Sequence, residues 1–294
     1  MPNVHNAAAQ QFRATLAKPE IMVVPGAGSP MDLRVIERTG FGAAYISGYA
    51  TAALRYGLPD IGLIAFNETS EMLRASRQVT TIPLIVDCDT GYGDVAGVRH
   101  TIRALENLGA AAVQLEDQTW PKRCGHMDGK IVETEEVAVR KIAAAVASRQ
   151  SDLVIIARTD SSQQYGIEAA VRRCQRFRDA GADVVFVDGP ESVEELEYIC
   201  ETLKGGGPVM VNMSESGKTP ILPTEELQRM GFKIAIFPSS SARLCVRVVS
   251  DFYADLKATG DSRPWINRMA TLGDTNETLG LNAIRDFETA LLTR

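Results

Sequence analysis

The chain has 294 residues, of which 45% are hydrophobic and 23% are charged, values that exclude a disordered or fibrous protein. Its 31 Lys and Arg residues face 37 Asp and Glu residues without a long basic cluster, so no nucleic-acid partner is expected. No apolar run reaches the roughly 20 residues that span a bilayer, and no membrane partner is expected either. Five cysteines without a CxxC pair indicate neither a disulfide framework nor a zinc cluster and favour a reducing, cytoplasmic location.

Eight short apolar runs, many of them rich in β-branched residues, recur along the chain, and each is followed by enough residues for a helix. The expected strands are residues 21–25, 43–47, 84–89, 111–116, 153–159, 183–188, 209–213 and 234–238. Most of these runs are continuous rather than alternating, as expected of parallel strands that are covered on both faces. Eight successive β-then-α units predict an α/β protein with a (β/α)8 TIM-type barrel.

Apolar residues at helical spacing predict the helices between the strands. They are expected at residues 98–108, 135–147, 168–180, 193–203, 224–230 and 242–257. Gly40, Gly109, Gly181 and Gly231 each stand a few residues before a strand, where glycine can adopt the left-handed conformation that ends a helix. The helix expected at 135–147 is preceded by Thr134, a residue type that caps helix N-termini.

The last 36 residues exceed what an eight-fold barrel needs. We expect a catalytic barrel over residues 1–258 and a helical extension over residues 259–294. Apolar side chains recur in the extension at helical spacing, at Leu279, Ile284, Phe287 and Leu291. Such a stripe must be buried on the same barrel or on another subunit, and we favour another subunit.

Acidic residues stand at two neighbouring strand ends, where a TIM barrel places its active site. Asp87 and Asp89 end the third expected strand, and a period of two puts them on one face. Glu116 ends the fourth strand, and three such acids repel one another unless positive charge lies between them. Hard oxygen ligands suit Mg²⁺, with Mn²⁺ as a possible substitute. The alternative is that these acids cap neighbouring loops or pair with Arg158 and Lys122.

Further polar residues follow other expected strand ends: Ser47, Asp117, Arg158, Asp160, Asp188, Asn212, Ser239 and Ser240. After the fourth strand, Lys122, Arg123, Cys124, Gly125 and His126 place a thiol among two cations and an imidazole. Such a setting shifts the pKa of a thiol and allows it to exchange protons. Because glycine permits backbone motion, this segment is also a candidate mobile loop.

Taken together, these segments resemble the isocitrate lyase/phosphoenolpyruvate mutase superfamily. The matching segments are residues 47–49 (SGY), 57–60 (GLPD), 86–93 (VDCDTGYG), 115–118 (LEDQ), 122–126 (KRCGH), 157–160 (ARTD), 212–215 (NMSE) and 217–220 (GKTP). The likeness extends over roughly residues 10–255, and the KRCGH segment is specific to the carbon–carbon lyase branch. Within that branch the chain is most similar to 2-methylisocitrate lyases, 2,3-dimethylmalate lyases and petal-death-type oxaloacetate hydrolases.

The resemblance implies a Mg²⁺-dependent lyase that cuts a 2-hydroxy dicarboxylate or tricarboxylate into an oxoacid and a carboxylic acid by retro-aldol chemistry. By this resemblance, the metal would be held, partly through water, by Asp87, Asp89 and Glu116. The metal-bound end of the substrate would be bound by Ser47, Gly48, Tyr49 and Arg158, with Asp60 nearby. The distal carboxylate would be bound by Gly125, His126, Asn212 and Ser214. Cys124 would be the general acid, and Arg158, His126 and Lys122 the other catalytic residues. It also implies a homotetramer made of helix-swapped dimers.

Two departures from the lyase pattern keep alternatives open. These lyases usually end the sixth strand in Glu, whereas this chain has Asp188, which is one methylene shorter; a bridging water could restore its contact with substrate or metal water. Hydroxyls at residues 239–241, Ser240 among them, leave oxaloacetate hydrolysis or decarboxylation on the same metal site as the alternative. The intact KRCGH segment disfavours a phosphonopyruvate mutase or hydrolase. A non-catalytic barrel that only binds a ligand is disfavoured because every expected site residue is present. The substrate itself is not decided, since one methylene changes specificity by only about 1–3 kcal/mol.

Overall fold

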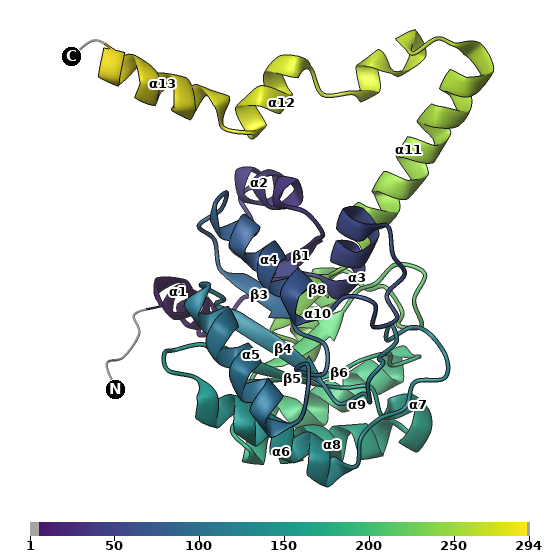
Figure 1. Ribbon diagram of the computed structural model, residues 1–294. Coiled ribbons are helices and arrows are strands. Elements are labelled where there is room, and N and C mark those ends of the chain that lie inside the picture. The colour runs from purple at the N-terminus through teal and green to yellow at the C-terminus, as the bar shows by residue number, and fades with distance from the viewer. Residues whose placement is uncertain (1–5, 293–294) are drawn as a thin grey trace.

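A closed barrel of eight parallel strands forms the centre of the computed structural model, which describes residues 6–292 (Figure 1). The strands are β1 (Met22–Ala27), β2 (Ala44–Ile46), β3 (Leu84–Asp87), β4 (Ala112–Glu116), β5 (Val154–Thr159), β6 (Val184–Val187), β7 (Val209–Asn212) and β8 (Ile234–Phe237). Their order in the sheet follows the chain, and β8 closes the barrel by pairing with β1. The predicted fold class is therefore confirmed.

Helices follow the strands and surround the barrel. They are α1 (Ala7–Leu16), α2 (Pro30–Thr39), α3 (Gly48–Thr51), a π-helical turn (Ala52–Tyr56), α4 (Phe66–Arg77), α5 (Val95–Asn107), α6 (Glu135–Ser148), α7 (Ser162–Tyr165), α8 (Ile167–Asp179), α9 (Val193–Leu203), a 3₁₀ turn (Lys204–Gly206), α10 (Thr224–Met230) and α11 (Ser240–Thr259). Helix α2 shows why such segments start and stop where they do. Ser29 and Asp32 form a reciprocal capping box at its start, and Gly40 ends it with a φ of 93°.

The apolar core has two parts. One fills the barrel, where side chains such as Tyr45, Ile156 and Phe186 are buried, and Phe12 of α1 packs into the same cluster. The other lies between the strands and the surrounding helices, where Leu105 and Phe177 are fully buried. Because the strands are buried on both faces, their sequences are continuously apolar rather than alternating.

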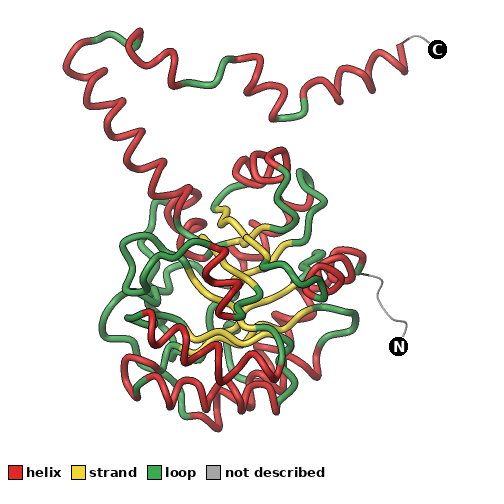
Figure 2. Tube along the Cα trace, turned by 180° about the vertical axis from the view of Figure 1, so that it is seen from behind, coloured by secondary structure: helices red, strands yellow, loops and turns green. Residues whose placement is uncertain are grey.

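The C-terminal extension leads away from the barrel. Figures 1 and 2 show α11 projecting outward and a further 3₁₀ turn (Arg263–Arg268), α12 (Leu272–Thr278) and α13 (Leu281–Leu292) forming an arm beyond α2. Ile284 and Phe287 of the predicted apolar stripe are 57% and 67% exposed. The arm touches the barrel through polar contacts such as the 3.0 Å ion pair of Arg38 with Glu277. This chain's own barrel therefore leaves the stripe uncovered, and the expected boundary at residue 258 falls in the last turn of α11.

The third strand is shorter than predicted. It ends at Asp87, and the chain then turns so that Asp89 has a left-handed φ of 47°. The expectation that both acids lie within one strand is wrong, although the turn returns Asp89 to the same mouth of the barrel, where it faces Lys122. Among the helices between residues 6 and 292, none combines the length and the apolar character needed to cross a membrane.

Candidate active site

A cavity of about 260 Å³ lies at the C-terminal mouth of the barrel, where the predicted site residues collect. Most of them line it: Ser47, Tyr49, Asp60, Asp87, Lys122, Cys124, Gly125, His126, Arg158, Asp188, Asn212 and Ser214. Gly48, Asp89 and Glu116 lie directly behind the lining, in contact with Asp87, Lys122 and Arg158 respectively. Ser240 is outside the lining, and its hydroxyl donates to Glu215 instead.

Lys122 neutralises part of the acidic cluster. Its ammonium group lies 2.5 Å from a carboxylate oxygen of Asp60 and 2.9 Å from one of Asp89, and all three side chains are buried. Burial disfavours the charged form of Lys122, but Asp89 and Asp60 outweigh that effect and hold its pKa well above the usual range. The pairing of acids with cations, which the sequence left as an alternative to metal binding, is thus present at Asp89.

The remaining acids are short of positive charge. Asp87 accepts long hydrogen bonds of 3.3–3.4 Å from Gly48, Asp89 and Gln114, and a hydrogen bond from the Tyr45 side chain. Glu116 has one carboxylate oxygen 3.5 Å from Arg158, and its other oxygen is buried without a hydrogen-bond partner. Burial raises the pKa of Glu116 well above its usual range and, together with neighbouring Asp87, raises that of Asp89 to about 7.

These groups fit a hard cation held partly through water. Their carboxylate oxygens are buried, and one oxygen of Glu116 has no hydrogen-bond partner. Burial also makes ionisation of Glu116 cost free energy, and a nearby positive charge would lower that cost. Within residues 6–292, no three His, Cys, Asp or Glu side chains are arranged to hold one metal ion directly. The assignment of Asp87, Asp89 and Glu116 to a metal therefore stays a prediction.

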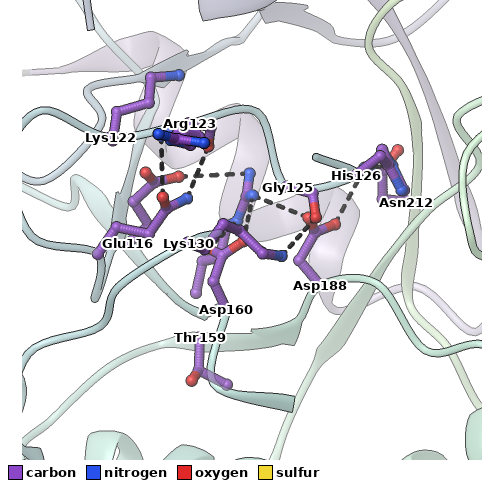
Figure 3. Close-up of polar contacts among 12 residues, drawn as sticks. Glu116, Lys122, Arg123, Gly125, His126, Lys130, Thr159, Asp160, Asp188 and Asn212 are labelled. Carbon is purple, nitrogen blue, oxygen red and sulfur yellow. Dashed lines mark hydrogen bonds and ion pairs between the residues drawn. The ribbon is translucent and has the colours of Figure 1, made fainter. Parts of the chain in front are cut away.

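Arg158 is the centre of a second buried network. Its guanidinium makes two 2.8 Å hydrogen bonds to Asp160 and a third to Asp188. Figure 3 shows how these two carboxylates lie in the mouth of the barrel. Burial opposes ionisation of Asp160, but Arg158 and Lys130 outweigh it and hold the pKa of Asp160 below its usual range. Although Asp188 is one methylene shorter than the acid usual at this place, it reaches Arg158 directly.

Cys124 lies on the loop of residues 119–131, called here the Cys124 loop. The side chains of Lys122 and Arg123 point away from the thiol, to Asp60 and to the backbone oxygen of Asp128. Burial, followed by the nearby charge of Asp60, raises the pKa of Cys124 to about 11. The expected shift of the thiol pKa is therefore upward, and at neutral pH Cys124 carries a proton that it can donate.

His126 presents donors to the distal part of the cavity. Burial lowers its pKa, so the ring is neutral at pH 7. Its Nδ1 lies 3.2 Å from the backbone N–H of Lys218 and accepts from it, which assigns the ring hydrogen to Nε2. Nε2 lies 3.1 Å from the amide nitrogen of Asn212, which donates to Asp188. With its hydrogen on Nε2, the ring therefore faces an N–H donor of Asn212, and an anionic ligand beside this pair would accept from both groups.

Several contributors were not found from the sequence. Arg243, in the first turn of α11, lines the cavity, donates to Ser216 and lies 3.8 Å from Glu215. Tyr45 points into the barrel below Asp87, and its pKa is raised by burial and by that carboxylate. Lys130 is buried against Asp160. Arg and Tyr within a helix or an apolar strand carry no spacing signal, so only the tertiary structure reveals them.

Comparison with known proteins gives consistent matches over nearly the whole chain. The sequence profile of the phosphoenolpyruvate phosphomutase family matches residues 12–257. The 2,3-dimethylmalate lyase of Eubacterium barkeri is 38% identical over 281 residues, which cover 95% of this chain and 96% of that protein. The 2-methylisocitrate lyase of Aeropyrum pernix is 37% identical over 94% of this chain and 88% of that protein.

Solved structures agree with these matches. The crystal structure of 2,3-dimethylmalate lyase has a TM-score of 0.91 at 36% identity and covers 99% of this chain and 96% of that one. Oxaloacetate acetylhydrolase in complex with 3,3-difluorooxalacetate has a TM-score of 0.92 at 31% identity, with 97% of both chains covered. Phosphonopyruvate hydrolase in complex with oxalate and Mg²⁺ has a TM-score of 0.88 at 28% identity and covers 97% of this chain and 99% of that one.

Proposed function

This chain belongs to the phosphoenolpyruvate phosphomutase family and is a carbon–carbon lyase, and we propose that it cleaves a 2-alkylmalate or 2-methylisocitrate type of substrate. The products would be an oxoacid, such as pyruvate, and a carboxylic acid. The family resemblance read from residues such as Cys124 and Arg158 is thereby confirmed, while the substrate and the residue roles below are proposals. Magnesium is the proposed cofactor.

The observation that carries the proposal is a protonated thiol facing a buried arginine across a small polar cavity. Cys124 and Arg158 both line the cavity, and the high pKa of Cys124 keeps its proton available at neutral pH. Retro-aldol cleavage leaves a carboxylate enolate, which needs stabilisation of its charge and then a proton on carbon. A cationic group and an acid of this kind meet both needs.

The substrate would be held at both of its ends. Arg158 and the backbone at Ser47 would bind the α-oxycarboxylate, as a planar guanidinium binds carboxylates through paired hydrogen bonds. His126, Asn212 and Ser214 would receive the distal carboxylate, since the ring N–H, the amide N–H and the hydroxyl can all donate to an anion. This placement brings the carbon that receives the proton toward the Cys124 loop.

Bound Mg²⁺ would supply positive charge to the oxygens of the oxoacid half as the carbon–carbon bond breaks. Asp87, Asp89 and Glu116 would hold it, and the Mg²⁺ in the phosphonopyruvate hydrolase complex is consistent with a divalent metal in this family. The substrate hydroxyl would pass its proton to one of the carboxylates that line the cavity, and the electrons of the breaking carbon–carbon bond would form the enolate. Cys124 would then donate its proton to the enolate carbon and regain a proton from water when the loop opens. The Cys124 loop would exclude water during these steps.

Oxaloacetate hydrolysis is the second candidate, and one observation favours it. Ser239 lines the cavity, with its hydroxyl 3.1 Å from that of Ser214, so two hydroxyls stand where a hydrated ketone could be bound. Oxaloacetate acetylhydrolase is also among the similar structures. Ser240, nominated from the sequence, is tied to Glu215, which makes Ser239 the hydroxyl to change first.

We further propose a homotetramer assembled from helix-swapped dimers. The exposed apolar stripe of α13 and exposed residues of α11 such as Leu244 and Tyr253 would be covered by a second copy. The projecting arm in Figure 1 supports an exchange between subunits, because it reaches beyond its own barrel.

The deciding experiment is product analysis by NMR with Mg²⁺ on 2,3-dimethylmalate, 2-methylisocitrate, other alkylmalates and oxaloacetate. Cleavage of a malate derivative that Cys124→Ser abolishes would establish the lyase and its acid. Turnover of oxaloacetate alone would reassign the protein as a hydrolase if oxalate and acetate appear, or as a decarboxylase if pyruvate and CO₂ appear. Full turnover by Cys124→Ser would refute the role of the thiol.

A further inference from the structure

The Cys124 loop is anchored at its base by its own hydrogen bonds, and its tip is held by contacts with the barrel. Gln118 and Val132 form an isolated β-bridge, and Thr119 donates its backbone N–H to Ile131 at 2.8 Å. The Gln118 side chain also bonds the backbone of Arg123 in both directions, at 2.8 and 2.9 Å. With the base anchored in this way, the contacts made by residues 123–131 hold the tip of the loop in its closed position.

One cation of the tip is buried on the barrel side. The Lys130 ammonium group donates to the backbone oxygen of Gly125, within the loop, and to Asp160, at the end of β5, at 3.1 Å (Figure 3). The side chains of Lys130 and Asp160 are only 2% and 0% exposed. A charge removed from water to this extent needs its partner for as long as the loop is closed, so loss of either group would disfavour the closed position.

The partner of Lys130 is the carboxylate that orients the catalytic arginine. Asp160 Oδ1 accepts from both Lys130 and Arg158, and Asp160 Oδ2 accepts from Arg158 Nε at 2.8 Å. Asp160 is fixed from behind, because its backbone N–H donates to Asp117 at 2.8 Å and Asp117 is paired with Arg173 of α8. The acceptor thus belongs to the rigid wall of the barrel, not to the loop.

The same contact sets the position of the loop backbone beside Cys124. A Cβ built on Gly125 would lie 1.7 Å from Asp188 Oδ2 and 2.3 Å from Arg158 Nη2, so the Gly125 backbone is packed directly against this ion pair. Lys130 donates to the Gly125 carbonyl and also pairs with Asp160, which binds Arg158. Lys130 therefore links the backbone next to Cys124 to the side of the cavity where Arg158 lies. No other cation of the loop does this, since Lys122 and Arg123 turn to Asp60 and Asp128.

We propose that Lys130 is a positioning residue that latches the Cys124 loop closed by joining the Gly125 carbonyl to Asp160. The latch makes closure of the loop and alignment of Arg158 one event, because both depend on the same carboxylate. Its importance for turnover rests on the proposed function, whereas its effect on the loop does not.

The loop offers a matched control on its outer face. Asp128 pairs with Lys218 at 2.9 Å, but its side chain is 89% exposed, and exposed ion pairs contribute little. Asp128→Asn therefore removes an ion pair from the same loop without touching the buried latch. Lys130→Met removes the buried pair, and Lys130→Gln retains a donor for Gly125 without the charge.

The test measures loop opening without substrate. Iodoacetamide labelling of Cys124 is followed by peptide mass spectrometry, which separates it from exposed Cys245, together with amide hydrogen exchange of residues 123–131. In both Lys130 variants, labelling and exchange should rise at least about tenfold, equivalent to about 1.4 kcal/mol in the closing equilibrium, while Asp128→Asn stays near wild type. Exchange of the β5 and β6 amides should be unchanged, which separates loop opening from general unfolding.

Turnover gives the second measurement. With the substrate identified by product analysis, kcat/KM should fall at least about tenfold in both Lys130 variants and stay within about twofold in Asp128→Asn. Wild-type labelling and exchange in folded Lys130→Met and Lys130→Gln would overturn the latch. Failure of wild type to cleave any malate derivative would refute the proposed function and leave the labelling result, and so the latch, to be judged by itself.

Discussion

Replacing Gly125 by alanine tests whether the backbone of the Cys124 loop must lie against the Arg158–Asp188 ion pair. The added methyl carbon would stand 1.7 Å from a carboxylate oxygen of Asp188 and 2.3 Å from a guanidinium nitrogen of Arg158. Neither atom can move aside easily, because both side chains are buried and form an ion pair with a distance of 2.8 Å. The substitution therefore forces either the loop or the ion pair to move.

The size of the effect follows from the overlap. Relief to ordinary contact requires a displacement of more than about 1 Å, and misplacement by that distance at a reacting centre costs on the order of 100-fold in rate. We expect kcat/KM to fall at least about 100-fold in Gly125→Ala. Stability should change little, within about 1 kcal/mol, because the loop can lift into solvent without exposing the barrel core.

The assay couples release of the oxoacid to a reductase that consumes NADH and is run beside thermal unfolding. Gly205→Ala is the matched control, since a Cβ at Gly205 meets no atom within 4 Å. It should retain wild-type kinetics. Near-normal turnover by Gly125→Ala, with an unfolding temperature equal to that of wild type, would refute the idea that the closed loop seen here is the reacting form.

Three further outcomes follow from the site and the extension. Burial raises the pKa of Cys124 to about 11, so an acid in this position keeps its proton through pH 9–10. A pH–rate profile that is limited by this acid should therefore fall only as the pH approaches 11. Replacement of the acid in Cys124→Ser should lower kcat by about 10²–10⁴-fold. Chelation by EDTA should abolish turnover and lower the unfolding temperature, and Mg²⁺ should restore both, whereas a metal-independent site would show neither change. Ile284→Glu with Phe287→Glu should break the apolar stripe of α13 and reduce the assembly mass measured by light scattering; an unchanged mass would contradict the proposed exchange.

The barrel could be predicted from the sequence because each strand is a continuous apolar run, and such runs are what a strand buried on both faces requires. The placement of Asp87, Glu116 and Arg158 followed from the rule that strand ends form the mouth. Boundaries were less certain for a physical reason. Asp89 follows an apolar run, so the sequence predicts that it lies in the strand. In the structure it has a left-handed φ and begins the turn that brings its carboxylate to Lys122.

What the sequence could not give are the contacts made between distant segments. Lys122 meets Asp60 across 62 residues, and Arg158 meets Asp188 across 30, so no local period relates them. Arg243 belongs to the amphipathic start of α11 and has the spacing of an ordinary surface residue. The direction of the Cys124 pKa shift was equally hidden, because flanking cations in sequence turned out to point away from the thiol.

The charge balance of the mouth links these observations to the cofactor. Seven carboxylates meet four cations there: Asp60, Asp87, Asp89, Glu116, Asp160, Asp188 and Glu215 against Lys122, Lys130, Arg158 and Arg243. The excess is negative, although the proposed substrate is itself an anion and would be repelled by it. Among these carboxylates, burial raises the pKa of Asp89 and of Glu116, and both acids are nominated for the metal. A divalent cation at these acids would remove the repulsion between the mouth and the substrate. It would also draw the α-oxycarboxylate to the side of the cavity that Arg158 occupies. The distal carboxylate would then lie on the opposite side, beside His126, Asn212 and Ser214.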